Sequence, residues 1–371
     1  MKSWRRGASA VAGVALPLVI AGCKSADTPQ TTFVPEGPFS RVSWDLIKPV
    51  FGIAALVFVL VQGLIVYAVV AFRRRSEDER PVQIHGSTAF ELGWTIAPAL
   101  VLAFVGFFTV SKVFYLDKQF KDSMQVEVIG HQWWWEYNYS DASGKVVVRT
   151  ANELHIPVGR KVQLNMTSGD VIHSFWPPKL AGKIDVIPGR RNHMTIQADR
   201  PDFYYGQCAE YCGLSHANMR LRVVSQTQAD FDSWMAASNA DTPARRYETV
   251  TTDNLATATA AEKGATLFLQ KGCSGCHAVN GISRGAVGPN LTYFNSRATF
   301  AGAIFENTDL NLRAWLRNAP EEKPGSLMPN LKLSETDITS LIAYLRTLGD
   351  PSLSTVDLAS GQAARTTPTT P

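Results

Sequence analysis

The sequence of 371 residues contains only five cysteines, and all of them lie inside short motifs. They stand at positions 23, 208, 212, 273 and 276, so no pair is left over for a structural disulfide. A strong charge excess is also missing. The formal net charge is +4, and three of those charges lie within residues 1–22, which we expect to be removed. A mature chain that is nearly neutral argues against nucleic-acid binding as its main task.

Long apolar runs are absent after residue 116, because the apolar residues are concentrated in three earlier blocks. The first block, residues 1–22, follows basic residues with a short apolar stretch and predicts a secretory signal. It ends in I-A-G-C at Cys23, which resembles a bacterial lipobox and implies a lipid on that thiol. The alternative is a first membrane span with an incidental cysteine. A run this short, interrupted by Gly13 and Pro17, makes a poor span.

The second and third blocks predict a transmembrane helical hairpin over residues 44–115. We expect one span at about 50–72 and the other at about 92–113, each long enough to cross the hydrocarbon. Three arginines follow the first span directly and indicate that the connecting loop is cytoplasmic. Both outer ends then lie outside the cell, in agreement with an exported N-terminus. Residues 23–43 are polar and rich in threonine and proline, which predicts a tether.

A dense group of soft metal ligands occurs near the middle of the chain. Cys208 and Cys212 are followed by His216 and Met219 within one short segment. Thiolate together with imidazole and thioether favours copper over hard cations. A single blue-copper ion needs one cysteine, whereas two cysteines can bridge two ions. The loop then lacks one imidazole, and His173 in the segment D-V-I-H-S can supply it.

These two segments resemble the dinuclear copper (CuA) centre of cytochrome c oxidase subunit II, through the pattern C-x-E-x-C-x3-H-x2-M and the upstream D-V-x-H-S. The resemblance implies two bridging cysteines, two terminal histidines and two weak axial ligands. It also implies a Mg²⁺ ion that the carboxylate of Glu210 shares with subunit I. The alternatives are a disulfide in an oxidising compartment or a mononuclear metal site, and both leave the histidines and methionine unexplained. The implied copper ligands are Cys208, Cys212, His173, His216, Met219 and the carbonyl of Glu210.

Short β-type runs with Gly, Pro and Asp between them follow from Met124 and predict an all-β domain over residues 116–238. With the copper ligands between late strands, a cupredoxin-like Greek-key sandwich fits best. A closing helix is expected at 226–238. The predicted strands are 125–129, 145–149, 161–165, 192–197 and 220–224.

Two further residues gain a role from the family resemblance. The segment G-H-Q-W-W-W places Trp133 at the surface ring through which electrons reach the copper, whereas Trp135 is expected to be a core residue. The segment E-x-x-W-T-x-x-P-A places Glu91 at the mouth of a proton path into subunit I. An acidic residue at a membrane edge needs no such role, however, because it can simply face water or lipid headgroups.

The last part of the chain predicts a second cofactor domain. Residues 239–258 lack apolar periodicity and predict a flexible linker. The C-x-x-C-H segment of Cys273, Cys276 and His277 is the haem c attachment signature. A zinc site or a redox C-x-x-C is the alternative, but no Cys or His follows His277. Met328 is the only later methionine and is therefore the expected sixth iron ligand.

Helices near 260–271, 309–318 and 334–348 would make residues 259–350 an all-α cytochrome c domain, resembling small class I cytochromes c. Residues 351–371 predict a disordered tail.

Together these features indicate subunit II of a bacterial cytochrome c oxidase with a fused cytochrome c. The expected partners are oxidase subunits I and III, membrane lipid, and a donor such as cytochrome c or a quinol:cytochrome c reductase. The expected location is the bacterial inner membrane, with both cofactor domains on the periplasmic side. The alternatives are a quinol oxidase subunit II and a free-standing lipoprotein that carries electrons or handles copper. The intact copper and haem motifs argue against the first, and the helical hairpin argues against the second.

Overall fold

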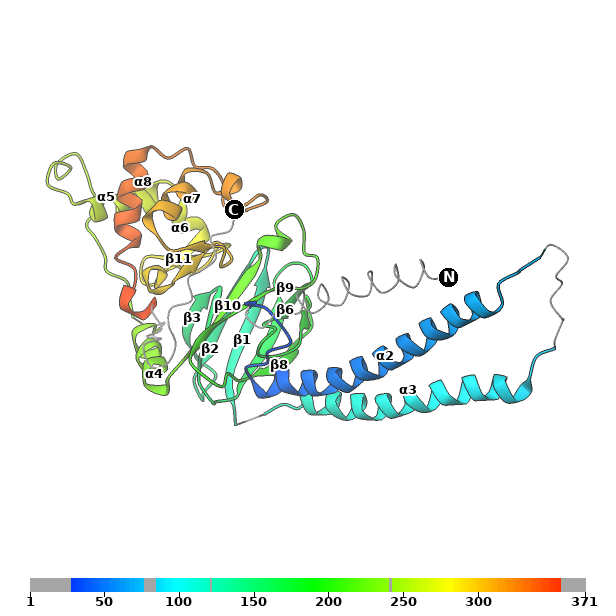
Figure 1. Ribbon diagram of the computed structural model, residues 1–371. Coiled ribbons are helices and arrows are strands. Elements are labelled where there is room, and N and C mark those ends of the chain that lie inside the picture. Colours follow the sequence, from blue (N-terminus) through cyan, green and yellow to red (C-terminus); the bar gives the residue numbers. More distant parts are fainter. Residues whose placement is uncertain (1–27, 77–84, 121, 240–241, 355–371) are drawn as a thin grey trace. The chain divides into compact units, whose positions relative to one another are not determined.

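The computed structural model describes residues 28–76, 85–120, 122–239 and 242–354 (Figure 1). The chain divides into two compact units, one of residues 41–118 and one of residues 1–40 with 119–371. The signal segment, Cys23 and the tail beyond residue 354 lie outside the described residues.

The smaller unit consists of two long apolar helices that run in opposite directions (Figure 1). Helix α2 spans Pro38–Ala71 and helix α3 spans Thr88–Leu116. No residue in the most apolar window of either helix is buried within the protein. Helices of 34 and 29 residues are about 50 and 43 Å long, more than the ~30 Å of hydrocarbon in a bilayer. The two predicted spans are therefore present, and α2 begins twelve residues before the expected start.

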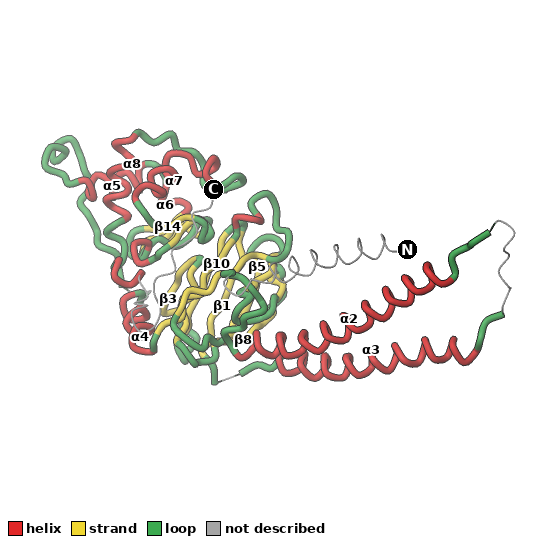
Figure 2. The backbone as a smooth tube through the Cα atoms, viewed as in Figure 1, coloured by secondary structure: helices red, strands yellow, loops and turns green. Residues whose placement is uncertain are grey.

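The larger unit contains a β-sandwich of two five-stranded sheets (Figure 2). One sheet has the order β3-β2-β1-β5-β8 and the other the order β4-β10-β9-β6-β7. Strand β1 is antiparallel to β2 and parallel to β5. The predicted all-β sandwich is confirmed, although only five of its ten strands were expected. The strands are β1 Met124–His131, β2 Trp134–Ser140, β3 Val146–Ala151, β4 Glu153–Pro157, β5 Val162–Ser168, β6 His173–Trp176, β7 Ile184–Val186, β8 Asn192–Ile196, β9 Asp202–Cys208 and β10 Arg220–Gln226.

Aromatic side chains from β2 and β6 fill the centre of the sandwich. Trp135 is fully buried and meets the ring of Phe175 edge to face, with centroids 5.2 Å apart. Tyr137 is equally buried against the same phenylalanine. The expectation that Trp135 belongs to the core is therefore confirmed, and its truncation to alanine would cost about 3–5 kcal/mol. Helix α4, Gln228–Ala237, packs Trp234 flat on His155 with ring centroids 4.1 Å apart.

The expected tether over residues 23–43 is wrong for its second half. The amide of Glu36 donates to the carbonyl of Lys179 at 2.8 Å and that of Ser40 to the carbonyl of Leu180 at 3.1 Å, and Phe39 has only 1% of its surface exposed. The carboxylate of Glu36 is nearly buried and pairs with Lys179 at 3.0 Å and Arg200 at 2.7 Å. Because both cations come from the sandwich, which lies far along the sequence, the composition of the segment alone could not indicate this docking.

The C-terminal module is built from helices around one apolar cluster. Helices α5 and α8 cross closely at Gly264, where a Cβ atom would lie 2.0 Å from the carbonyl oxygen of Ser340. The predicted helical module is present, and two short hairpins were not expected. Its elements are α5 Ala260–Gln270, α6 Cys273–Cys276, β11 His277–Val279, β12 Ser283–Ala286, η2 Phe294–Ser296, β13 Thr299–Phe300, β14 Phe305–Glu306, α7 Asp309–Glu322, α8 Glu335–Leu345 and η3 Pro351–Ser354.

The expected flexible linker over residues 239–258 is also wrong for its described part. The amide of Ala244 donates to the carbonyl of Asn280 at 2.9 Å, and that of Val250 donates to the hydroxyl of Thr266 at 2.9 Å. Tyr247 packs against the apolar cluster of the C-terminal module. These contacts hold residues 242–258 along the module, so the segment is part of that fold.

Candidate copper and haem sites

The candidate copper ligands converge because strand β6 pairs with strand β9. This pairing sets Phe175 opposite Cys208, and His173 at the start of β6 then faces the loop that follows β9. The two sulfur atoms of Cys208 and Cys212 are 3.8 Å apart, and both cysteines are free and only 3% exposed. Three donors, His173 Nδ1 and the two sulfur atoms, lie within 4.8 Å of one another.

The remaining expected ligands surround the same sulfur pair. His216 Nδ1 lies 3.5 Å from the sulfur of Cys212, and Met219 Sδ lies 3.8 Å from it. The carbonyl oxygen of Glu210 lies 3.2 Å from the sulfur of Cys208. His216 and Met219 come from the short helix η1, His216–Asn218, and its C-terminal neighbour. All six donors expected from the sequence are thus brought together.

Hydrogen bonds orient His173 toward the sulfur atoms. Its Nε2 bonds to the carboxylate of Asp170 at 2.8 Å, which leaves Nδ1 facing Cys208. The same carboxylate accepts the backbone amides of Gln132 and Val171, both at 2.6 Å. Burial alone would raise the pKa of Asp170, but these hydrogen bonds hold it below its usual value. An ionised Asp170 in turn increases the basicity of His173 as a ligand.

The sulfur pair is electrostatically suited to a cation. A hydrogen bond from Cys212 lowers the pKa of Cys208 to about 4, so one thiolate forms readily. The pKa of Cys212 is raised, because a second negative charge would lie beside the first in a buried site. Two thiolates are stable here only with positive charge between them. The soft donors and their burial therefore fit copper.

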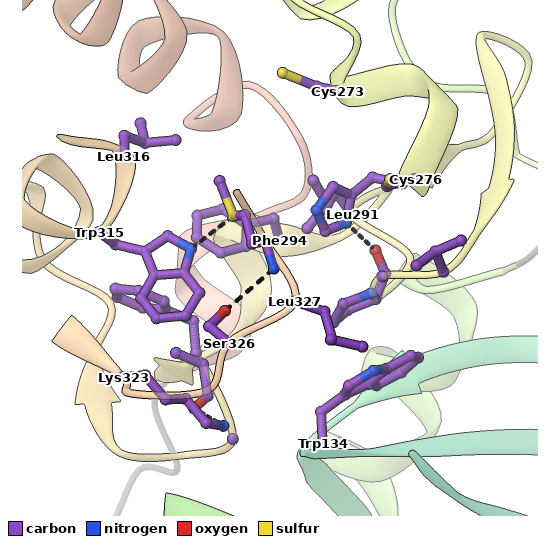
Figure 3. Close-up of a pocket in the computed structure, with 18 of the residues that line it drawn as sticks. Trp134, Cys273, Cys276, Leu291, Phe294, Trp315, Leu316, Lys323, Ser326 and Leu327 are labelled. Atoms are coloured by element: carbon purple, nitrogen blue, oxygen red, sulfur yellow. Dashed lines mark hydrogen bonds between the residues drawn. The ribbon is translucent and has the colours of Figure 1, made fainter. Parts of the chain in front are cut away.

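The C-terminal module contains a large cavity with the expected haem ligands on its wall (Figure 3). Cys273, Cys276, His277 and Met328 all line it, together with apolar residues of α5, α7 and α8. The space not filled by atoms is about 1360 Å³, its mouth to solvent included. A largely apolar wall that carries two cysteines, a histidine and a methionine fits a porphyrin with its iron ligands.

Both candidate axial ligands of the haem site are held by hydrogen bonds. His277 Nδ1 donates to the carbonyl of Pro289 at 2.8 Å, which leaves Nε2 for iron. Burial lowers the pKa of His277, so the imidazole stays neutral as an iron ligand must be. Trp315 Nε1 donates to the sulfur of Met328 at 3.1 Å (Figure 3). Nothing in the sequence pattern indicated the part played by Trp315.

Trp133 lies between the two candidate sites. Its ring nitrogen donates to the carbonyl of Cys212 at 3.0 Å, and the same residue lines the haem cavity. It occupies the turn between β1 and β2 and is only 8% exposed, so the expected exposure of this ring at the surface is wrong. The neighbouring Trp134 also lines the cavity and stacks on His131, with ring centroids 4.3 Å apart.

Comparisons with known proteins cover almost all of this architecture. Three family models match the chain. The transmembrane domain of cytochrome c oxidase subunit II matches residues 40–111, the periplasmic domain of the same subunit matches residues 143–227, and cytochrome c matches residues 261–349. Cytochrome c oxidase subunit 2 of Alkalihalophilus pseudofirmus is 34% identical over 94% of this chain and 99% of its own length. The chain belongs to the cytochrome c oxidase subunit II family. The subunit 2 of Bacillus sp. (strain PS3) is 34% identical over 75% of this chain and 80% of its own.

A solved structure of the periplasmic domain of subunit II from Bradyrhizobium japonicum is 29% identical, covering 33% of this chain and 96% of that one, with a TM-score of 0.30. The expectation of a subunit II with a helical hairpin, a cupredoxin-like sandwich and a C-terminal cytochrome c is confirmed by the family matches. These families point to copper and haem c as the cofactors of this subunit II.

The two acidic residues expected to act beyond this subunit II chain are both exposed. Glu91 lies in the first turn of α3, where a carboxylate interacts favourably with the helix dipole. The side chain of Glu210 is exposed, although its backbone carbonyl faces the buried sulfur of Cys208. Their roles in proton uptake and magnesium binding depend on subunit I and stay predictions.

Proposed function

We propose that this subunit II carries electrons from a covalently attached haem c to a dinuclear copper centre, and from there to subunit I of a bacterial oxidase. Oxygen would be reduced there to water with proton pumping. The observation that carries the proposal is the position of Trp133. Its ring nitrogen bonds to the carbonyl of the candidate ligand Cys212, while the same residue forms part of the wall of the haem cavity.

In the copper site, Cys208 and Cys212 would bridge two ions, and His173 and His216 would each bind one. Met219 and the carbonyl of Glu210 would complete the set. The metal pair supplies the exchange of single electrons, and the protein supplies a rigid and nearly dry setting. Asp170 fixes the orientation of His173, and the strands β6 and β9 fix the spacing of the donors. Donors that do not move on reduction favour rapid electron exchange.

In the haem site, Cys273 and Cys276 would hold the porphyrin by thioether bonds. His277 and Met328 would be the axial ligands, and methionine ligation raises the potential of the iron. The hydrogen bonds from His277 to Pro289 and from Trp315 to Met328 orient these two donors. The apolar wall of the cavity excludes water from the iron.

The proposal also covers the surroundings of the chain. Lipid on Cys23 and the two spans would anchor the chain in the inner membrane, with both cofactor domains in the periplasm. Glu91 would serve a proton path, and Glu210 would share Mg²⁺ with subunit I. The donor would be a cytochrome c or a quinol:cytochrome c reductase, and subunit III would complete the assembly. The proposed domain boundaries are those expected from the sequence, with residues 28–40 joined to the sandwich and 242–258 to the cytochrome domain.

The test is electron paramagnetic resonance on the oxidase purified from native membranes. We expect one electron shared over two copper nuclei, and iron from one covalent haem per subunit II. The variant Cys212→Ser should lose the shared-electron signal and keep the haem, because both bridging thiolates are needed to hold the two coppers close together. A spectrum from one isolated copper in the wild type would reject the dinuclear assignment.

A further inference from the structure

A hairpin of the cytochrome domain lies against the copper domain, and both belong to one compact unit. This hairpin consists of β13 and β14, and its loop residues Ala301, Gly302 and Ala303 all have positive φ, at 55°, 84° and 58°. Alanine adopts this conformation only at an energetic cost. The shape of the loop turns backbone carbonyls toward the sandwich, where Gly302 O accepts the backbone amide of Arg220 at 3.0 Å.

Lys323 joins this loop to the candidate electron route. Its amine nitrogen donates to the carbonyl of Trp133 at 2.7 Å and to the carbonyl of Ala301 at 2.9 Å. The residue is only 4% exposed, so water does not replace these bonds. A buried amine is costly unless it is hydrogen-bonded. Both an ammonium and a neutral amine have enough N–H groups for the two carbonyls, so the contact does not depend on the charge state.

A second buried polar contact crosses the same interface. Glu153 of strand β4 is 1% exposed and accepts the hydroxyl of Thr299 at 2.6 Å and the amide of Ala298 at 3.1 Å. Burial lowers the pKa of the adjacent Arg297 to about 10, and the charge of Glu153 opposes that shift. Buried polar groups satisfied only across an interface fix one arrangement of the two surfaces, because sliding would leave them unpaired.

The surfaces also fit too closely for other side chains. A Cβ atom on Gly302 would lie 2.6 Å from the amine of Lys323 and 3.0 Å from the carbonyl of Trp133. A Cβ atom on Gly325 would lie 3.2 Å from the ring of Trp133 and from Leu214. Figure 3 shows Lys323 and Trp134 at the same end of the pocket, away from Cys273. The ring of Trp133 is therefore enclosed by the cytochrome domain.

We propose that Lys323 is a positioning residue that fixes the cytochrome domain on the backbone carbonyl of Trp133 and so reserves this tryptophan for the haem of the same chain. The proposal rests on the electron route proposed above. Its consequence is that an external cytochrome delivers electrons to the haem of this chain and has no direct access to Trp133. Docking is then a fixed feature of the fold, and a flexible tether would not be needed.

The test is the rate of electron transfer from haem to copper in the purified oxidase complex. A photoexcited ruthenium complex reduces the haem, and absorbance at the haem and copper bands follows the passage of one electron from the reduced haem to the oxidised copper pair. Lys323→Met has similar length and no donor, and it should slow the step by about tenfold or more, the range expected when a buried hydrogen bond that holds the two domains together is lost. Lys323→Gln, which keeps an N–H donor, should recover part of the rate.

Lys263→Met is the matched control, since it removes a partly exposed lysine from helix α5 of the same domain and should leave the rate unchanged. The paramagnetic resonance of the copper, the absorption spectrum of the haem and the reduction potentials of both should be unchanged in every variant. A substitution that disturbed the metal ligands would change them. A reduced soluble class I cytochrome c should reduce the copper directly in Lys323→Met, without first reducing the haem of the chain. In the wild type it should reduce the copper only by way of that haem.

A wild-type rate in Lys323→Met, or an equal effect of soluble cytochrome on both proteins, would overturn the proposal. If Lys323→Met does not assemble, the haem-to-copper rate is measured in Lys323→Gln and in the isosteric Thr299→Val. Wild-type rates in both variants would reject the proposal. Absence of the copper pair or the haem in the wild type would instead reject the proposed function.

Discussion

The two cofactor sites hold their cysteines in different ways. Cys208 and Cys212 are almost fully buried at the end of a strand, and their neighbouring donors are fixed by hydrogen bonds within the sandwich. Cys273 is partly exposed and Cys276 is exposed, on a four-residue helix at the edge of a cavity. The sandwich therefore positions the copper ligands by its own fold, whereas the cytochrome domain needs the haem to complete its fold.

The lining of the haem cavity shows why the difference matters for stability. Phe268, Leu312 and Leu341 line the cavity and also belong to the buried apolar cluster of the domain. Protein interiors are close-packed, so these side chains need a partner of the right volume on the cavity side. A haem supplies that partner. In the sandwich, the core around Trp135 packs on itself and meets the candidate copper ligands at His173.

The largest effect should come from removing the thioether links. In Cys273→Ala/Cys276→Ala we expect the cytochrome domain to lose most of its stability, which for a domain of this size is about 5–15 kcal/mol. Hydrogen exchange measured by mass spectrometry should show α5 and α8 exchanging at nearly unfolded rates. The matched variant Cys212→Ser should lose the copper pair and leave exchange in β1 and β5 as in the wild type. Equal loss of protection in both domains would contradict the comparison.

A smaller effect should follow from removing the axial methionine alone. Met328→Ala should keep the haem attached, abolish the weak near-infrared band of methionine–iron ligation and lower the potential. We expect a loss of about 2 kcal/mol in the stability of the domain, because Met328 is only partly buried and Trp315 Nε1 loses its acceptor. Optical spectroscopy and redox titration of the intact subunit measure these changes. Survival of the band would show that Met328 is not the ligand.

Spacing in the sequence was sufficient to name the candidate ligands of both sites. The two copper cysteines and His216 lie in one loop, and the haem attachment residues are consecutive, so local pattern carries the chemistry. The approach of His173 depends on the pairing of β6 with β9, which was not predicted. His173 was named because the loop lacks one imidazole and because of the family resemblance. Trp315 and Lys323 carried no local signal, because their partners Met328 and Trp133 are brought to them by the tertiary fold.

The helices and strands with a clear apolar pattern were also predicted from the sequence, and the other elements were missed. Long apolar runs identified both membrane helices, and alternating apolar residues identified half of the strands. The missed strands β4 and β6 are almost wholly buried, so they lack the alternation that marks a strand with one face in water. The segments predicted to be a tether and a linker are polar in composition. They are ordered by hydrogen bonds and ion pairs to distant residues, which composition does not reveal.

The smallest expected effect concerns acid stability of the sandwich and depends on His155. Burial lowers the pKa of His155 below its ordinary value, Arg297 acts in the same direction, and Glu153 and the hydrogen bond to Gln226 oppose the shift. The folded protein therefore resists protonation of this ring, while the unfolded chain takes up the proton below about pH 6.5. Because the unfolded state binds more protons, stability falls as the pH decreases below that value, by at most about 1.4 kcal/mol per pH unit.

The measurement is hydrogen exchange of the peptide covering β4 in the intact protein at pH 7.5 and pH 5.5, corrected for intrinsic exchange rates. In the wild type the protection should decrease at the lower pH. His155→Asn keeps an N–H near Gln226 but cannot take up a proton, so it should lower protection at pH 7.5 by losing the stack on Trp234 and lose less on acidification. His193→Asn, on the partly exposed strand β8, should keep the wild-type acid response. The same acid-induced loss in His155→Asn as in the wild type would assign the response to the carboxylates of the sandwich.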